Sequence, residues 1–181
     1  MVEINPSYLT KENLKKIKES FLNSDFPAVI LKDFFNTKSF EELNKKVNSL
    51  NFKKEVNLLS HSYSSSDIDI NSKEFLDFLS KIFSNKNKFT FKAYKFTWKD
   101  YLILNDEFVE KPGMDIIINI SDWNPRGGGI INYTDGKGDA YPITAEKNSI
   151  AIINRKKGIQ KFVQYVNHYG KDRERIFIIG N

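Results

Sequence analysis

The sequence contains no cysteine, which excludes disulfide bonds and zinc sites built on cysteine ligands. It has only two histidines, so few imidazole ligands are available for any metal. Its apolar runs are only a few residues long, far below the roughly 20 residues that a membrane-spanning helix needs. Residues 1–25 are polar and lack the apolar core of a signal peptide. We therefore expect a cytoplasmic protein with no membrane partner.

The composition predicts a folded chain. Of 181 residues, 40% are hydrophobic, and these include 15 Phe and 8 Tyr. This supply of large apolar side chains supports one domain over residues 1–181 with a sizeable core. The net charge of +5 comes from lysines spread along the chain, which favours ordinary solvated lysines over a nucleic-acid footprint.

The first half of the chain reads as mainly helical. Apolar residues recur every three to four positions in three segments, and a residue able to cap a helix stands before each. We expect helices over residues 10–23 (capped by Thr10), from Thr37 or Ser39 to residue 50, and after Ser72 to residue 83. Residues 26–35 indicate a buried strand and turn, and the serine-rich residues 59–69 a flexible loop. Residues 1–87 thus form a helical segment with one or two strands.

From residue 88 the apolar pattern changes to a period of two, which indicates strands. Expected strands cover residues 89–97, 101–104, 115–121, 130–134, 149–154, 160–166 and 175–179. Glycine and proline turns separate most of them, and residues 127–129 (GGG) read as a turn that needs positive φ rather than as a phosphate loop. This spacing predicts a β-sandwich or barrel with the helices packed on one outer face.

Several motifs follow one another in a recognisable order. They are residues 100–107 (DYLILNDE), 116–123 ending in Trp123, 127–130 (GGGI), Pro142, 148–150 (NSI), Val163 with Val166, and 175–180 (RIFIIG). Together they resemble the prolyl-hydroxylase-like 2-oxoglutarate/Fe(II) oxygenases, particularly the ribosomal prolyl hydroxylase branch. The resemblance implies an α+β fold. Its core over residues 88–181 is a double-stranded β-helix (a jelly roll, cupin-like), and the N-terminal helices of residues 1–87 buttress it.

The resemblance also implies a degenerate iron site. In the family, two histidines and one carboxylate hold Fe(II). On this sequence the first histidine becomes Asn105, the carboxylate becomes Glu107, and the second histidine becomes Lys161, or Gln160 after a slip of one residue. An amide is a weak ligand for Fe(II), and an ammonium has no lone pair to offer. The expectation is therefore no metal and no cofactor; an active site would use Fe(II) and 2-oxoglutarate.

A physical replacement for the metal is an ion pair. Glu107 and Lys161 would face each other where iron would sit, and Asn105 would hydrogen-bond both. As an alternative, Asp106 and Glu107 together with Asp115 would offer oxygen ligands to a hard cation such as Mg²⁺.

Other residues have both a functional and a structural interpretation. The resemblance places Arg175 where the family grips the distal carboxylate of 2-oxoglutarate; the alternative is a pair with a local acid across the sheet. Tyr101 and Trp123 are candidates for lining a cleft, although core packing is favoured for Trp123 and Trp98. The basic cluster of residues 155–157 with Lys161 is expected to form a solvated turn rather than a nucleic-acid contact.

The leading hypothesis is a catalytically inactive relative of these oxygenases. It would act as a binding or scaffold module that recognises a protein or a small acidic ligand through the residual cleft. The alternatives are an active Fe(II)/2-oxoglutarate-dependent hydroxylase with an atypical site, and a basic adaptor that binds RNA or a ribosome.

Overall fold

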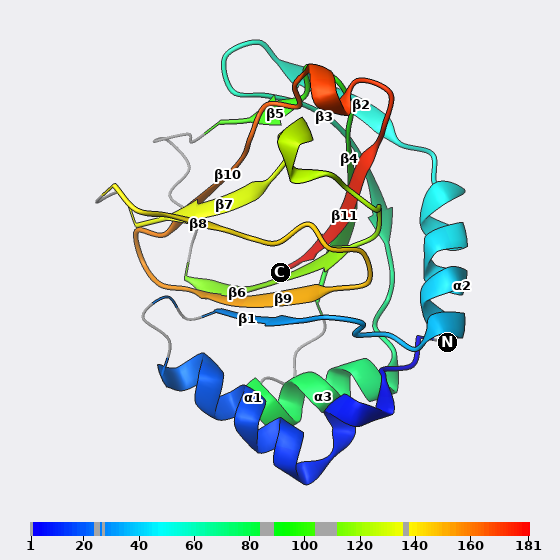
Figure 1. Cartoon of the computed structure of the whole chain (residues 1–181), viewed down its shortest axis with the longest axis vertical. Helices are drawn as coiled ribbons and strands as arrows, with labels where there is room; N and C mark the ends of the chain where they lie inside the picture. Colours follow the sequence, from blue (N-terminus) through cyan, green and yellow to red (C-terminus); the bar gives the residue numbers. More distant parts are fainter. Residues whose placement is uncertain (1, 24–25, 27, 84–88, 104–111, 136–137) are drawn as a thin grey trace.

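The computed structural model describes residues 2–23, 26, 28–83, 89–103, 112–135 and 138–181. Its helices are α1 (Lys11–Asn23), α2 (Thr37–Asn48) and α3 (Lys73–Phe83), and three short 3₁₀ turns accompany them: η1 (Pro6–Leu9), η2 (Pro125–Gly127) and η3 (His168–Gly170). In this part of the chain, every helix is too short or too polar to cross a membrane. Figure 1 shows α1 and α3 packed below the strands, and α2 along one side.

The helix starts follow the expected capping chemistry with one correction. The Thr10 hydroxyl accepts a hydrogen bond from the Asn13 amide (3.2 Å), and the Ser72 hydroxyl accepts one from the Phe75 amide (3.2 Å). Helix α2 is not capped by Thr37 or Ser39. Instead, the Asn36 side chain accepts from the Ser39 amide at 2.8 Å. Asparagine is at least as good an N-cap as serine or threonine, so the cap lies one residue before Thr37 and three before Ser39.

The strands form one curled antiparallel sheet whose order runs β1-β9-β6-β11-β4-β3-β5-β10-β7-β8, with β2 paired to β3. Their bounds are β1 (Ala28–Leu31), β2 (Lys53–Asn57), β3 (His61–Ile68), β4 (Phe91–Phe96), β5 (Tyr101–Leu102), β6 (Gly113–Asn119), β7 (Ile131–Thr134), β8 (Ala140–Pro142), β9 (Ile150–Arg155), β10 (Gln160–Val163) and β11 (Arg175–Gly180).

The strand order is that of a double-stranded β-helix. Strands β4, β11, β6 and β9 lie side by side in one layer, and β5, β10, β7 and β8 lie side by side in the facing layer. The chain thus passes back and forth between the two layers, while β3 joins them by pairing with both β4 and β5. The expected α+β jelly roll with N-terminal helices is confirmed (Figure 1).

The serine-rich residues 59–69 correct the sequence-based prediction, because most of them form strand β3 rather than a flexible loop. Strand β3 is paired on both sides, with β2 along one edge and with β4 and β5 along the other. Residues 1–87 therefore contain three strands, not one or two. Serine and histidine have weak strand propensity, but two flanking partners satisfy the backbone and override it.

Two hydrophobic clusters divide the interior between the two faces of the larger layer. On β6, Ile116 and Ile118 belong to the cluster beneath the helices, whereas Ile117 belongs to the cluster enclosed between the layers. Because side chains alternate along a strand, Asp115 and Asn119 share the enclosed face with Ile117. The barrel interior therefore receives two polar side chains from one central strand.

Candidate functional site

Lys161 lies inside the barrel. It stands on β10 opposite Tyr133 of β7, on the same strand face as the core residue Val163. Its ammonium group is 3.2 Å from Oδ2 of Asp115, and only 12% of its side chain is exposed. Gln160, the alternative position, precedes it on β10 and points to the opposite face. The position that the resemblance gives to the second histidine is thus occupied by a buried, ion-paired lysine.

Asp115 is the acid that the sequence analysis did not single out as the partner of Lys161. Its side chain is fully buried on β6, and its Oδ2 accepts a 2.7 Å hydrogen bond from the Tyr133 hydroxyl. The Nε of Arg155 lies 3.0 Å from the same oxygen, in an ion pair whose N–H is not aligned as a hydrogen bond. Its other oxygen, Oδ1, has no hydrogen-bond partner among the residues that the structure describes. Two cations and a hydroxyl therefore converge on one carboxylate.

This convergence does not suit a divalent cation. The suggestion that Asp115 helps to hold Mg²⁺ with residues 106 and 107 requires carboxylate oxygens free of ammonium and guanidinium groups. Here Lys161 and Arg155 already neutralise Asp115, and both would repel a cation. Across the described ranges, no group of three His, Cys, Asp or Glu side chains is placed to hold a metal.

Asn105 and Glu107 lie outside the described residues, as does Asp106. The ion pair between Glu107 and Lys161, and the overlay of these positions on the iron ligands, therefore remain predictions. What the structure adds is that Lys161 points into the barrel, as that prediction requires, and that Asp115 is one of its partners.

Arg175 opens β11 and is fully buried on the enclosed face. Its Nη2 donates to Oδ1 of Asn119, its Nη1 donates to the carbonyl of Ile176 at 3.3 Å, and its guanidinium carbon lies 5.0 Å from the ring centre of Phe177. Its Nε has no hydrogen-bond partner in the described part of the chain. Burial lowers the pKa of this guanidinium to about 9, because the charged form loses its hydration.

The neighbours of Arg175 exclude the local-acid interpretation within the described structure. Its side-chain partner is an amide, and Asn119 is itself held in place by donating to the Thr144 carbonyl (2.9 Å) and the Ser149 hydroxyl (2.8 Å). An amide oxygen orients a guanidinium but does not neutralise it. Arg175 is therefore a buried cation whose described partners carry no charge, and its fork is suited to a carboxylate.

Trp123 lies in the core, where its indole N–H donates to the Gly128 carbonyl at 2.7 Å. Gly129, with φ +64°, lies close to both Trp123 and Arg175. A Cβ built on this glycine would be 3.3 Å from Arg175 Cγ and 3.5 Å from the Trp123 ring. The positive φ expected of residues 127–129 is confirmed at Gly128 and Gly129. Trp98, in contrast, is 40% exposed, so core packing was the wrong interpretation for it.

Tyr101 lies away from the barrel interior. It is half-buried on β5, and its hydroxyl donates to the Leu58 carbonyl at 3.0 Å. The preceding residue, Asp100, is buried and accepts hydrogen bonds from the Ser62 hydroxyl (2.7 Å), the Thr97 amide (2.9 Å) and the Lys54 ammonium group. The acid of the DYL motif therefore fastens the turn before β5 to the β2–β3 hairpin.

The expected solvated basic turn is only partly right. Lys156 and Lys157 are exposed in the turn between β9 and β10. Arg155 and Lys161, which flank that turn, point inward to Asp115 instead. Strand alternation on either side of the turn distinguishes the inward-pointing residues from the exposed lysines. It places residues 153 and 155 of β9, and residues 161 and 163 of β10, on the enclosed face.

Comparison with known proteins agrees on the architecture. The solved structures similar to this chain include a prolyl-4-hydroxylase of Pseudomonas putida (TM-score 0.69, 10% identity, covering 92% of this chain and 96% of that one). They also include an oxidoreductase of the 2OG-Fe(II) oxygenase family from Burkholderia pseudomallei (TM-score 0.71, 8% identity, 94% and 91%). A third is a prolyl hydroxylase from Trichoplax adhaerens, in complex with a peptide fragment of the hypoxia-inducible factor oxygen degradation domain (TM-score 0.64, 10% identity, 93% and 88%).

These likenesses define the class of fold: the chain has the double-stranded β-helix of the prolyl hydroxylase and 2OG-Fe(II) oxygenase structures, over nearly its whole length. No family model matches the sequence. At 8–13% identity the likeness establishes the fold, and the chemistry has to be argued from this chain's own side chains.

Proposed function

We propose that this protein is a non-catalytic relative of the 2-oxoglutarate/Fe(II) oxygenases that binds a small carboxylic acid inside its barrel. The observation that carries the proposal is Arg175, a fully buried guanidinium whose described partners are an amide, a carbonyl and an aromatic ring. Both ends of the barrel interior agree with this proposal. Arg175 at one end can bind an acid, and the ion-paired Lys161 at the other does not suit a metal.

The end of the barrel that holds Lys161 and Asp115, where the sequence resemblance would place iron, does not suit an iron ion. Lys161 stands at the position that the sequence resemblance gives to the second histidine, and as an ammonium paired with Asp115 it has no lone pair for a metal. Arg155 adds a second cation within 3.0 Å of the same carboxylate. An Fe(II) ion placed there would face two positive groups in a medium of low dielectric constant, where repulsion is stronger than in water.

The end of the barrel that holds the Arg175 guanidinium has the chemistry to bind a carboxylate. Taking a guanidinium out of water costs free energy that an amide partner repays only in part, and the unpartnered Nε still has a donor to offer. A ligand carboxylate would neutralise the charge and accept hydrogen bonds in the planar geometry that arginine prefers. On β6, Asn119 is four residues from Asp115, about 13 Å along the strand at roughly 3.3 Å per residue. The two polar ends are therefore separate.

The test measures metal and acid binding separately. We expect Fe(II) titration to show no stoichiometric site, and 2-oxoglutarate, succinate or a related acid to stabilise the metal-free protein. A ligand at about 100 times its Kd adds about 2.7 kcal/mol, which raises Tm by roughly 5 to 10 °C in a domain of this size. Arg175→Met should abolish the shift and Arg175→Lys should retain part of it. Arg126→Met removes an exposed arginine and should change nothing.

Two outcomes would contradict the proposal. Stoichiometric iron binding with 2-oxoglutarate-dependent formation of succinate would make the protein an active oxygenase with an atypical site. A panel of mono- and dicarboxylic acids that shifts Tm equally in the wild type and in Arg175→Met would remove the acid-binding role.

A further inference from the structure

Most of the large hydrophobic side chains that are exposed among the described residues come from the β2–β3 hairpin, the segment from β4 to just beyond β5 and the segment after β10. Figure 1 shows the hairpin and β5 at the upper end of the molecule, opposite α1 and α3. We call this surface the hairpin face, after the β2–β3 hairpin at its edge; it consists of Val56, Leu58, Leu59, Trp98, Ile103, Tyr165 and Tyr169. Leu58 and Leu59, at the tip of the hairpin, are 87% and 84% exposed. Single exposed hydrophobic residues are common, but a contiguous group marks an interaction site.

Hydrogen bonds show that the segments of the hairpin face are neighbours. The Ile103 amide donates to the Ser60 carbonyl (2.9 Å), and the Tyr101 hydroxyl donates to the Leu58 carbonyl (3.0 Å), so the hairpin tip is attached to β5. The Val166 amide donates to the Asp100 carbonyl (2.8 Å), which attaches the segment after β10 to the same strand. The face is therefore one surface built from three parts of the chain.

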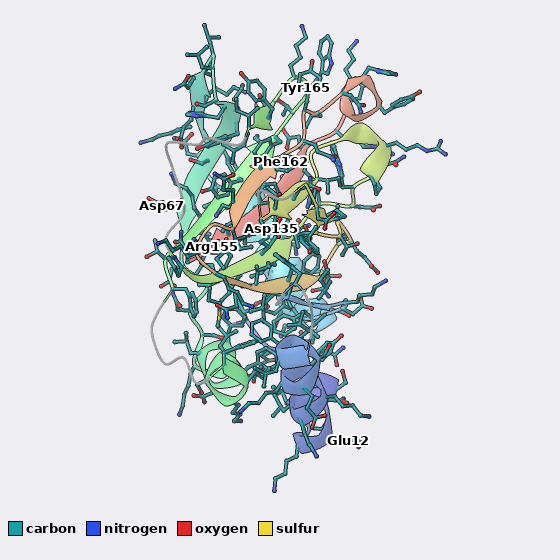
Figure 2. All side chains as sticks on the ribbon, turned by 90° about the vertical axis from the view of Figure 1, so that its left-hand side faces the viewer. Glu12, Asp67, Asp135, Arg155, Phe162 and Tyr165 are labelled. Atoms are coloured by element: carbon teal, nitrogen blue, oxygen red, sulfur yellow. The ribbon has the colours of Figure 1, made fainter. Side chains whose placement is uncertain are left out.

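A groove of ≈ 620 Å³ runs across this surface between β5 and the end of β10. Its lining is apolar apart from one glutamine: Tyr101, Leu102, Ile103, Phe162, Val163, Gln164 and Tyr165. Figure 2 shows Phe162 on β10 and Tyr165 beyond it at the upper end of the molecule. Because Val163 belongs to the enclosed core, its neighbour Phe162 lies on the outer face of the barrel. The groove therefore includes the outer face of β10, and Arg175 is not among the residues that line it.

Among the described residues around Trp98, the exposed charge is positive. The ammonium groups of Lys99 and Lys171 lie 4.3 Å and 5.4 Å from the ring centre of Trp98, and both lysines are exposed. The one acid of the adjoining turn, Asp100, is buried and already accepts from Lys54. Asp172 and Arg173, the next residues along the chain, are of opposite sign and cancel.

We infer that the hairpin face docks an acidic segment of another protein, with an apolar side chain of that segment seated in the groove between β5 and β10. An apolar patch with complementary charge at its rim is typical of protein–protein interfaces. Single-stranded nucleic acid could stack on the tyrosines of the face, but the most exposed part of the face, Leu58 and Leu59, is aliphatic and gives bases no stacking surface. A second copy is disfavoured because a two-fold contact would place this positively charged surface against an identical positively charged surface.

The test uses three labelled probes in fluorescence anisotropy: short amphipathic peptides of leucine and glutamate, the same peptides with lysine in place of glutamate, and oligo-uridylate. We expect the wild type to bind the acidic set at least about tenfold more tightly than the basic set, and less tightly at high salt. Leu58→Ser/Leu59→Ser should lose about tenfold, as should Lys99→Glu/Lys171→Glu. Leu22→Ser, on α1 at the far end, is the matched control because Leu22 is 68% exposed and should bind as the wild type does.

Equal binding of the acidic set by the wild type and the leucine variant would overturn the inference. So would a preference for the basic set, binding of oligo-uridylate alone, or no binding of any probe. None of these variants touches Arg175, so the acid-dependent rise in Tm should survive in all of them. Failure of the docking site is thereby distinguishable from failure of the interior acid site.

Discussion

The buried position of Asp115 allows a quantitative test of the ion-pair cluster. We expect Asp115→Asn to lower the free energy of unfolding by about 3 to 5 kcal/mol, because it removes a buried carboxylate that two cations share. The side chains of Asp115, Arg155 and Lys161 are 0%, 7% and 12% exposed, so water cannot replace the lost carboxylate. Asparagine keeps the shape of the side chain and an oxygen for the Tyr133 hydroxyl.

A second lysine–carboxylate pair gives a control at the same distance. Lys95 and Glu174 also lie 3.2 Å apart, but the glutamate side chain is 50% exposed. Glu174→Gln should therefore cost no more than about 1 kcal/mol, the value typical of surface pairs. The measurement is urea-induced unfolding followed by circular dichroism, with the free energy extrapolated to water.

Double substitution separates charge from packing. In the Asp115→Asn background, Lys161→Met should recover part of the lost stability, because it removes one of the two cations that faced the carboxylate and fills similar volume. If Asp115→Asn costs as little as Glu174→Gln, or if adding Lys161→Met makes the protein still less stable, the view of an ion-paired cluster inside the barrel is refuted.

Two further predictions concern the backbone and pH. Gly128→Ala should lower the free energy of unfolding by about 3 kcal/mol or more, because φ is +75° and the new Cβ would lie 2.0 Å from a backbone carbonyl oxygen. Gly138→Ala, at φ +113° with no atom within 4 Å, should lower it by about 1 kcal/mol. Equal losses of stability in urea unfolding would contradict this reasoning. The Ser65 hydroxyl donating to Glu55, aided by Lys92, holds the pKa of Glu55 below its usual value near 4.5. The folded state thus binds fewer protons than the unfolded chain, so the stabilisation from Glu55 is full above a pH of about 4.5 and is lost as the pH falls through the lowered pKa. Glu55→Gln should therefore make stability fall less steeply with decreasing pH. An unchanged slope would argue against a lowered pKa for Glu55.

The sequence predicts the barrel well because its strands follow a simple alternation. The apolar residues 116–118 and 177–179 lie on strands that pair side by side at the centre of the larger layer, and Lys161 falls on the enclosed face as expected. Strand β3 was missed because its own residues carry almost no apolar signal; its partners, distant in the sequence, impose the strand.

The partner of Lys161 was missed for a related reason. Asp115 and Lys161 are 46 residues apart and come from opposite layers, so no local spacing connects them. The sequence motif indicated Glu107, which lies outside the described residues, and the single acid at the start of the run DIIINI was a second physical signal. A charged residue in an otherwise apolar central strand must find a partner inside the fold or remain unpaired.

The buried cations at the two ends of the barrel, Lys161 and Arg175, differ in what neutralises them. If a lysine simply replaced a metal-binding histidine, it would leave a buried ammonium with nothing to neutralise it, at a cost of several kcal/mol. In this chain a carboxylate from β6 faces Lys161 of β10, and Arg155 of β9 shares it, so strands of both layers meet at this cluster. No carboxylate from the described residues neutralises Arg175. An interior that supplies a carboxylate to its cations at one end, and supplies none from the described residues to the guanidinium at the other, is the arrangement expected when a ligand provides the missing anion.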